Sequence, residues 1–189
     1  MELKGERRLP VHRTAAWNAL NDPEVLRACI PGCESVEPVG DGAYAVGVAV
    51  ALGPVRARFK GTLRVEDVIA PASYTLRFEG QGGAAGFAKG SAQVSLAEDG
   101  PTTILRYTVA AQVGGRIAQV GNRLIDSAAL KLADDFFAAF EARVAGDSPA
   151  QGHAPTEQPA PLAGPSIARR IAYFAVLVVL VVLAFGLLR

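Results

Sequence analysis

The 189-residue chain has few of the side chains that most often carry out chemistry. It contains two histidines, two cysteines, one methionine and one tryptophan, and its formal net charge is only +1. His12 and His153 are far apart in sequence, and neither pairs with a cysteine at a metal-ligand spacing or with a serine as a general base would. A nearly neutral chain also argues against nucleic acid, because a phosphate-binding face normally leaves a clear basic excess. We therefore expect no metal site, no nucleophilic catalysis and no nucleic-acid partner.

The remaining reactive groups also have simple explanations. Cys29 and Cys33 are spaced as CxxxC around Pro31, and in a reducing cytosol we interpret them as free thiols, with a redox pair as the alternative. The glycine-rich stretch 80–86 lies between two predicted strands, without a helix N-terminus that would help to bind phosphate. Adjacent carboxylates occur at strand ends or on a helix surface, which favours a solvated face over an acid/base pair. These pairs are Glu66-Asp67, Glu98-Asp99 and Asp134-Asp135.

Near the C-terminus, charge is missing altogether. No charged residue occurs from Ile171 to Leu188, and a helix of this length spans roughly 27 Å, close to the hydrocarbon thickness of a bilayer. Arg169 and Arg170 precede this run, which by the positive-inside bias places the rest of the chain in the cytoplasm. The charged N-terminus lacks the apolar region of a secretory signal. We expect a single-pass, tail-anchored protein of the inner (cytoplasmic) membrane, with a soluble pro-segment or a buried core helix as the alternative.

Composition divides the chain into three parts. Residues 1–145 have the apolar periodicity of one globular domain. Residues 146–166 are rich in proline, alanine and glycine, which indicates a disordered linker that reaches between about 25 Å as a coil and about 65 Å when extended. Residues 167–189 form the predicted transmembrane anchor. The domain is therefore expected to move near a membrane surface without leaving it.

Within the globular part, the apolar period indicates an α+β fold. A strand over 1–10 is followed by two short helices, the second capped by Asp22. The pattern then alternates with period two up to Val113, and it changes to helical spacing for about 30 residues from Gly114. A curved antiparallel sheet around one long helix is the helix-grip arrangement. The expected inward positions of that helix are Ile117, Val120, Leu124, Ala128, Leu132, Phe136 and Phe140.

The clearest strand pair is a hairpin with its turn at Gly53-Pro54. This turn sets Leu52 opposite Val55 and makes one face of the hairpin wholly apolar. On the other face, small residues of the first strand lie across from a basic row, which comprises Arg56, Arg58 and Lys60. We interpret the basic row as a solvated face. Docking of a partner protein or of an anionic membrane surface is the alternative.

Four phrases of the sequence, taken together, resemble one known family. They are CIPGCESVEPVGDGAY, LGPVRARFKG, GFAKGSAQV and VGGRIAQVGNRLIDSAAL…FFAAF. They are similar to those of the CoxG family of carbon monoxide dehydrogenase subunits, in the SRPBCC (START-like) superfamily, over residues 1–145. The resemblance implies a helix-grip fold with an interior apolar cavity, and association with a molybdenum-containing hydroxylase of the carbon monoxide dehydrogenase type. It does not imply that this chain binds molybdenum or oxidises a substrate.

Small residues on the inward face indicate where an apolar cavity would lie. A glycine at an inward strand position either bends the strand or leaves room beside it, and both interpretations stay open. Phe87 falls on the otherwise polar face of its strand, as a bulge residue or as part of a lid. The expected lining of the cavity is Ala57, Phe59, Gly61, Leu63, Tyr74, Leu76, Phe78, Phe87, Gly90, Tyr107, Val109, Ala111, Ile117, Val120 and Leu124.

These observations favour a non-enzymatic accessory protein and leave two functions open. As an adaptor, the chain would recruit the dehydrogenase to the membrane so that electrons enter the respiratory chain. As a carrier, it would take a quinone or another isoprenoid lipid from the bilayer and present it to the dehydrogenase, without any covalently bound cofactor. The two functions are compatible. An enzyme related to the aromatases or cyclases of the superfamily is a third possibility, but convergent polar groups are lacking.

Overall fold

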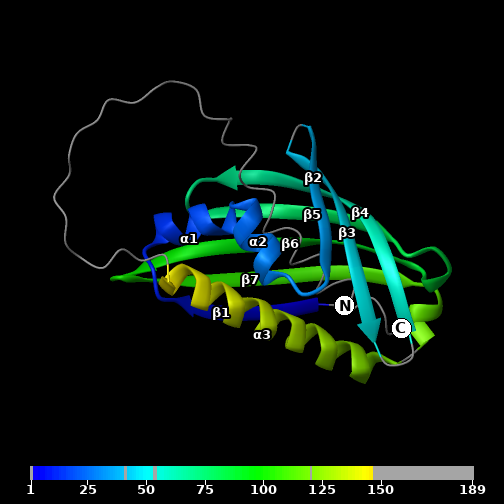
Figure 1. Cartoon of the computed structure of the whole chain (residues 1–189). Helices are drawn as coiled ribbons and strands as arrows, with labels where there is room; N and C mark the ends of the chain where they lie inside the picture. The colour runs from blue at the N-terminus through cyan, green and yellow to red at the C-terminus, as the bar shows by residue number, and fades with distance from the viewer. Residues whose placement is uncertain (1, 41, 53–54, 120, 147–189) are drawn as a thin grey trace.

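The structure is a computed structural model, and it describes residues 2–40, 42–52, 55–119 and 121–146. One curved antiparallel sheet has the strand order β1-β7-β6-β5-β4-β3-β2, and the helices lie on its inner face (Figure 1). The strands are β1 (Glu2–Leu9), β2 (Cys33–Gly40), β3 (Ala43–Leu52), β4 (Val55–Ile69), β5 (Ser73–Gln81), β6 (Phe87–Asp99) and β7 (Thr102–Gly114). The helices are α1 (Arg13–Leu20), α2 (Pro23–Cys29) and α3 (Asn122–Gly146), with short 3-10 turns η1 (Gly83–Ala85) and η2 (Arg116–Gln119).

The register of the sheet confirms the predicted hairpin. β3 and β4 pair with Leu52 opposite Val55 and with Ala51 opposite Arg56, so the apolar and the basic faces separate as the alternation requires. The turn at 53–54 lies outside the described residues. The sheet continues from this hairpin through β5, β6 and β7 to β1 without a parallel pair. The predicted curved sheet is therefore confirmed.

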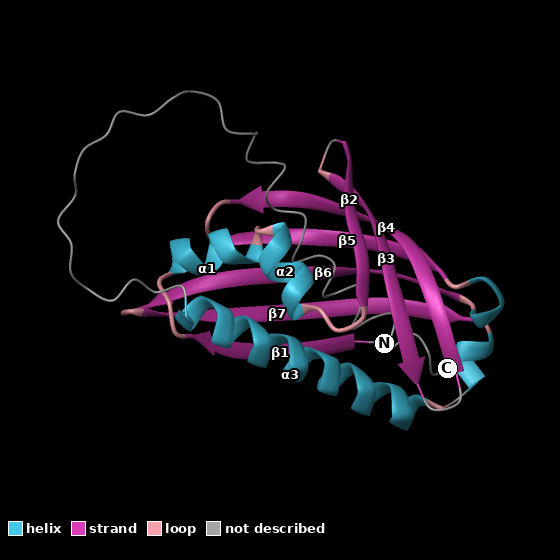
Figure 2. Ribbon diagram, in the orientation of Figure 1, coloured by secondary structure: helices cyan, strands magenta, loops and turns pink. Residues whose placement is uncertain are grey.

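The two short helices close one end of the inner face. Asp22 caps α2 because its carboxylate accepts hydrogen bonds from the backbone N–H groups of Glu24 (2.8 Å) and Val25 (3.4 Å). Trp17 of α1 packs edge-on against Tyr74 of β5, with ring centres 5.5 Å apart. Both predicted helices are confirmed, and together they cover the end of the sheet where β6 turns into β7 (Figure 2).

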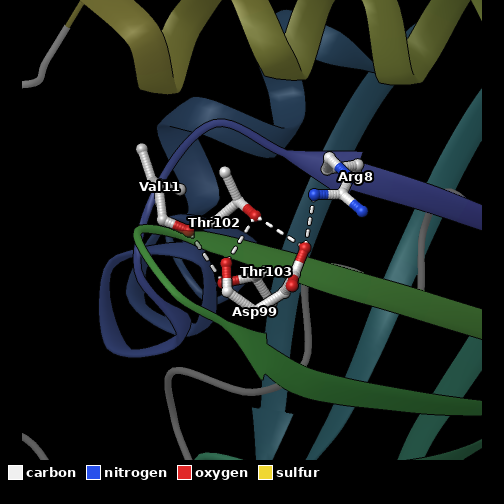
Figure 3. A network of polar contacts seen from close by, with 5 residues as sticks. All are labelled: Arg8, Val11, Asp99, Thr102 and Thr103. Carbon is white, nitrogen blue, oxygen red and sulfur yellow. Dashed lines mark hydrogen bonds and ion pairs between the residues drawn. The ribbon is translucent and has the colours of Figure 1, made fainter.

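A polar network fastens the same end (Figure 3). The buried hydroxyl of Thr103 donates to the carbonyl oxygen of Val11 (2.8 Å), which connects β7 to the segment before α1. Thr102 bonds the backbone and the carboxylate of Asp99 across the β6–β7 turn, and Arg8 forms an ion pair with the same carboxylate. We call this end, where α1, α2 and the β6–β7 turn meet, the closed end.

The C-terminal helix differs from its prediction. Gly115 and Gly121 adopt φ values of +101° and +98°, a left-handed backbone that interrupts the expected continuous helix. The regular part is α3, with 25 residues, preceded by the separate turn η2. Its buried side chains are Ala129, Ala133, Phe136, Phe137, Phe140 and Val144, so Phe136 and Phe140 are confirmed as inward positions.

Other predicted helix positions are less buried or are not described. Leu124 is 44% exposed, and Ala128 and Leu132 are half-buried. The reason is geometric, because repeated four-residue steps drift by about 40° each from the 3.6-residue turn and leave the buried stripe. The side chain of Ile117 and all of Val120 lie outside the described residues, as do the predicted linker and anchor beyond Gly146.

Candidate functional site

The structure gathers most of the predicted lining residues on one apolar inner face. Cross-strand pairing joins Leu63 to Phe78, Phe78 to Gly90 and Gly90 to Ala111, so these four form one row across four strands. Other inward residues form parallel rows beside it. The predicted residues that this face brings together are Ala57, Phe59, Gly61, Leu63, Tyr74, Leu76, Phe78, Gly90, Tyr107, Val109 and Ala111.

Two of the inward glycines are explained by close approach of strands. A Cβ atom on Gly90 would overlap the carbonyl oxygen of Ala110 and would lie 2.6 Å from Cζ of Phe78. One on Gly61 would lie 2.6 Å from the carbonyl oxygen of Glu79. The space of the missing side chains is thus already filled by the neighbouring strand and by an aromatic ring. At both positions the structure favours bending of the sheet over room left beside it.

Burial instead indicates an opening at one end of the inner face. Leu63 and Leu76 in the middle are fully buried. Toward the start of α3, Val50, Ala57 and Val113 are only half-buried, although they also face inward. We call this end the open end: it comprises η1, η2, the adjoining strand ends and the first turns of α3 (Figure 2). The inward side chains at the open end are therefore less completely buried than those in the middle of the face.

Two glycines bring the connections at the open end into close contact. A Cβ atom on Gly115 would overlap Cα of Gly86, so the loops that carry η1 and η2 are in backbone contact. Both residues have positive φ, which glycine adopts without strain. This contact positions the start of α3 relative to the β5–β6 connection.

Phe87 lies at the open end, but on the outer face of the sheet. It opens β6 in regular pairing with Gln81 and Gly114, so the bulge interpretation is wrong. Because Ala88 points inward, the ring of Phe87 points outward, and a Cβ atom on Gly114 would lie 2.6 Å from its Cε1. Phe87 therefore covers Gly114 and, with 39% of its side chain exposed, does not line the inner face.

Sequence reasoning missed an inward-facing cation. Arg7 donates a hydrogen bond to Asp134 of α3, and its guanidinium lies 5.4 Å from the centre of the Phe137 ring. Phe137 in turn stacks on Tyr107, with ring centres 5.7 Å apart. Burial raises the pKa of the Tyr107 hydroxyl, an effect that the charge of Arg7 partly opposes. The sequence carried a signal for the inward position of Arg7, because Leu3, Arg7 and Leu9 lie at alternate positions of β1 and therefore share one face.

The basic row lies on the outer face, as predicted. Arg56, Arg58 and Lys60 are exposed, and Arg58 donates to Glu34 over 2.8 Å. Farther along the same face is a hollow of about 690 Å³ with polar residues such as Thr62, Ser91 and Gln112 in its wall. This hollow lies on the side of the sheet opposite to the expected apolar cavity.

The remaining reactive groups are free thiols and ion-paired carboxylates. Cys29 and Cys33 are both free thiols, and burial raises the pKa of each, which keeps them protonated near neutral pH. Every adjacent carboxylate pair has at least one member in an ion pair with an arginine or lysine, as on a solvated face. These ion pairs are Arg77–Glu66, Arg13–Glu98, Arg8–Asp99, Arg7–Asp134 and Lys131–Asp135.

The described part of the chain contains neither a cluster of metal ligands nor a membrane-spanning helix. Among residues 2–146, apart from the three short gaps, no group of three or more histidine, cysteine, aspartate or glutamate side chains could hold a metal ion. Within the same part of the chain, no helix is long and apolar enough to cross a membrane. The apolar run 171–188 lies outside that part.

Comparison with known proteins identifies related sequences and folds. The model of the family of carbon monoxide dehydrogenase subunits described as CoxG matches residues 5–145. A conserved protein of Geobacillus kaustophilus is 30% identical, with a TM-score of 0.73, over 77% of this chain and 96% of its own. A START superfamily protein of Mycobacterium smegmatis (13% identity, TM-score 0.60, 77% and 97% covered) shares the fold. A protein of Thermus thermophilus also shares it, with 18% identity and a TM-score of 0.56 over 78% of this chain and 99% of its own. No curated protein matches the chain significantly.

These coverages also bear on the limits of the domain. The matched part is 77–78% of this chain, yet it corresponds to almost the whole length of each of these three solved proteins. In those proteins the shared fold therefore makes up almost the whole chain. The described residues have their own buried core, so we expect them to fold without residues 147–189.

Proposed function

Because the chain belongs to the CoxG family of carbon monoxide dehydrogenase subunits and has a START-like fold, we propose that it is a ligand-binding accessory protein of a molybdenum-containing dehydrogenase. In this proposal the chain oxidises nothing itself. It binds an apolar molecule on the inner face of its sheet and brings that molecule to the dehydrogenase. Electrons from the dehydrogenase then reach the membrane respiratory chain through the carried molecule.

The observation that carries this proposal is the one-sided burial of the inner face. Most inward residues near α1 and α2 are buried, whereas Val50, Ala57 and Val113, toward the start of α3, are only half-buried. An apolar face that is less buried at one end than at the other suits a long ligand that enters with one end first.

A quinone is the ligand class that we favour. Its isoprenoid tail requires an apolar slot, and the half-buried Val50, Ala57 and Val113 lead from the open end to the buried apolar rows of the inner face. Such a molecule also explains the apolar run at 171–188, because a carrier of a bilayer-soluble ligand benefits from being held at the bilayer. We propose that this run anchors the protein in the inner membrane, with the domain in the cytoplasm, and that residues 146–166 are the tether.

A pure adaptor is the second candidate function. In that case the tail alone recruits the dehydrogenase to the membrane, and the inner face is only a core. The exposed basic row of Arg56, Arg58 and Lys60 keeps this candidate open, because an exposed set of cations can capture an acidic partner. Arg58 contributes least to such a surface, since Glu34 neutralises it.

Ligand extraction distinguishes the two functions. Full-length protein is purified in detergent from cells that make the dehydrogenase, and the organic extract is analysed by mass spectrometry. The carrier predicts a quinone in near-stoichiometric amount. It also predicts loss of this quinone from Ala57→Phe, which fills the open end, and retention by Ala110→Phe, which places the same ring on the exposed outer face of β7. A quinone-free wild-type protein that still recruits the dehydrogenase to membranes contradicts the carrier and leaves the adaptor.

A further inference from the structure

We propose that the open end is a membrane-docking surface, which places exposed apolar side chains in an anionic bilayer surface and surrounds them with cations. The apolar residues are Phe87 and Leu124, and the cations are Lys60, Lys89, Arg116 and Arg123. The proposal is based on the exposure of these apolar side chains and on the charge of the cations around them. It rests on the proposed function in one respect, namely that a bilayer-soluble ligand would enter through the same end.

The two apolar side chains protrude from separate elements at this end. Leu124 is 44% exposed in the first turn of α3, and Phe87 is 39% exposed at the first residue of β6. The backbone contact between Gly86 and Gly115 holds the loops that lead to them. Exposing large apolar side chains to water is unfavourable in free energy. Contact with another apolar surface, such as lipid, removes this penalty.

The cations around them lack compensating ion pairs. Lys60, Lys89, Arg116 and Arg123 are all exposed, and none forms an ion pair with another described residue. Glu79, opposite Lys89 in the strand register, is the described carboxylate beside this set. The side chain of Asp126 lies outside the described residues. A group with this excess of positive charge is attracted by an anionic surface.

The closed end differs mainly in its ion pairs, because it also exposes apolar side chains, namely Val68 and Ile69 at the end of β4. Arg8 and Arg13 at this end form ion pairs with Asp99 and Glu98, whereas the exposed Arg27 of α2 forms none with a described residue. Uncompensated cations and exposed Phe and Leu side chains thus coincide at the open end, and this combination is typical of segments that lie in a membrane interface. An acidic protein partner would use the cations but would not require the apolar tips to protrude.

The length of the chain permits this orientation. α3 has 25 residues and is about 37 Å long, and it ends near α1, at the closed end (Figure 1). Residues 147–166 span at most about 65 to 70 Å when fully extended. A tail that leaves the closed end can therefore enter the same bilayer that the open end touches.

The first experiment locates the contact in the full-length protein. The chain is reconstituted into vesicles of mixed neutral and anionic lipid with brominated acyl chains, which quench nearby tryptophan. Leu124→Trp is compared with Leu130→Trp, a position that is 50% exposed on another side of the same helix. The proposal predicts strong quenching of the tryptophan at 124 and little at 130. Equal quenching of the two variants overturns it.

The second experiment tests the charges with residues 1–146. Sedimentation with anionic vesicles is measured for Lys89→Glu combined with Arg116→Glu, and for the control Arg27→Glu combined with Arg64→Glu. All four positions are exposed, and both double variants change the net charge equally. Because each cation near an anionic surface contributes about fivefold in binding, the first variant should bind at least tenfold more weakly, and the control should bind like wild type. Binding that is equal on neutral and anionic vesicles, or equal loss in both variants, overturns the proposal.

The same variants separate this surface from the other hypotheses. If reversal at 89 and 116 leaves vesicle binding intact but abolishes salt-dependent capture of the dehydrogenase, the surface is a protein interface and the proposal is wrong. Quinone is measured in extracts of the full-length proteins. A wild-type protein that docks on anionic lipid but carries no quinone contradicts the proposed function while supporting the docking surface.

Discussion

Arg7, near the end of the first strand, donates a hydrogen bond to Asp134 in the middle of the last helix. This contact joins residues that are 127 positions apart in sequence and connects α3 to the edge of the sheet. The guanidinium also lies over Phe137, so the charge has an aromatic partner as well as a carboxylate. The C-terminal half of α3 is thereby fixed to the sheet, while its first turns at the open end are more exposed.

Replacing Arg7 should destabilise the domain modestly. Arg7→Gln removes a partly exposed ion pair and a cation–π contact, and it should lower the free energy of unfolding by about 1 kcal/mol. Arg106→Gln, which breaks the exposed Arg106–Glu6 pair on the outer face, is the control and should change it by less than about 0.5 kcal/mol. Urea unfolding followed by the fluorescence of Trp17 measures both. Equal effects would mean that Arg7 does not hold α3.

The glycine contact at the open end should be more sensitive than a glycine with free space. Gly115→Ala requires a left-handed backbone and makes Cβ overlap Cα of Gly86, so we expect a loss of about 2 to 3 kcal/mol. Gly121→Ala has a similar φ but nothing within 4 Å, so only backbone strain of about 1 to 2 kcal/mol is expected. Thermal unfolding compares the two variants. A milder effect at 115 than at 121 contradicts the close packing of η1 and η2.

Filling the inner face should be tolerated at the open end only. Ala92→Phe, at a fully buried position in the middle of the sheet, should cost about 1 to 3 kcal/mol through overpacking. Ala57→Phe, at a half-buried position, should cost clearly less because the new ring can extend toward solvent. Chemical denaturation of residues 1–146 measures both variants without ligand. If Ala57→Phe destabilises as strongly as Ala92→Phe, the open end is closed in solution.

Alkaline pH should weaken the fold. Burial raises the pKa of Tyr74 well above its ordinary value of 10.0 and raises that of Cys29 above 9.0. The unfolded chain therefore releases protons that the folded chain retains, so stability is fully present below about pH 9 and falls as the pH rises further. Urea unfolding across this range should show the decline. Tyr74→Phe should flatten its upper part, and an unchanged slope would assign the decline to other groups.

The anchor hypothesis has a direct test in cells. Full-length protein should sediment with membranes and resist extraction by high salt, whereas residues 1–146 should be largely released by salt because only the docking surface remains. Immunoblots of the fractions measure both forms. Full-length protein that stays soluble, or a truncated form that resists salt as well as the full chain does, would contradict the anchor at 171–188.

Much of the fold could be predicted because its signals are local. The period-two pattern around Gly53-Pro54 determined the register of β3 and β4, and Asp22 marked the start of α2. The four phrases were also sufficient to identify the family, since the family model matches nearly the same residues. The candidate site was harder to predict, because a list of inward residues does not say which of them remain accessible.

The sequence by itself determined which side chains face inward and that a basic row faces outward, because alternation along a strand follows from backbone geometry. Only the tertiary structure decided that the ring of Phe78 occupies the space beside Gly90, that Phe87 points to the outer face and that Arg7 pairs with Asp134. Each of these depends on how strands and helices far apart in sequence approach one another. The opening beneath the start of α3 has the same origin: two left-handed glycines end the local helical pattern, and packing against the sheet then fixes where the helix can bury its side chains.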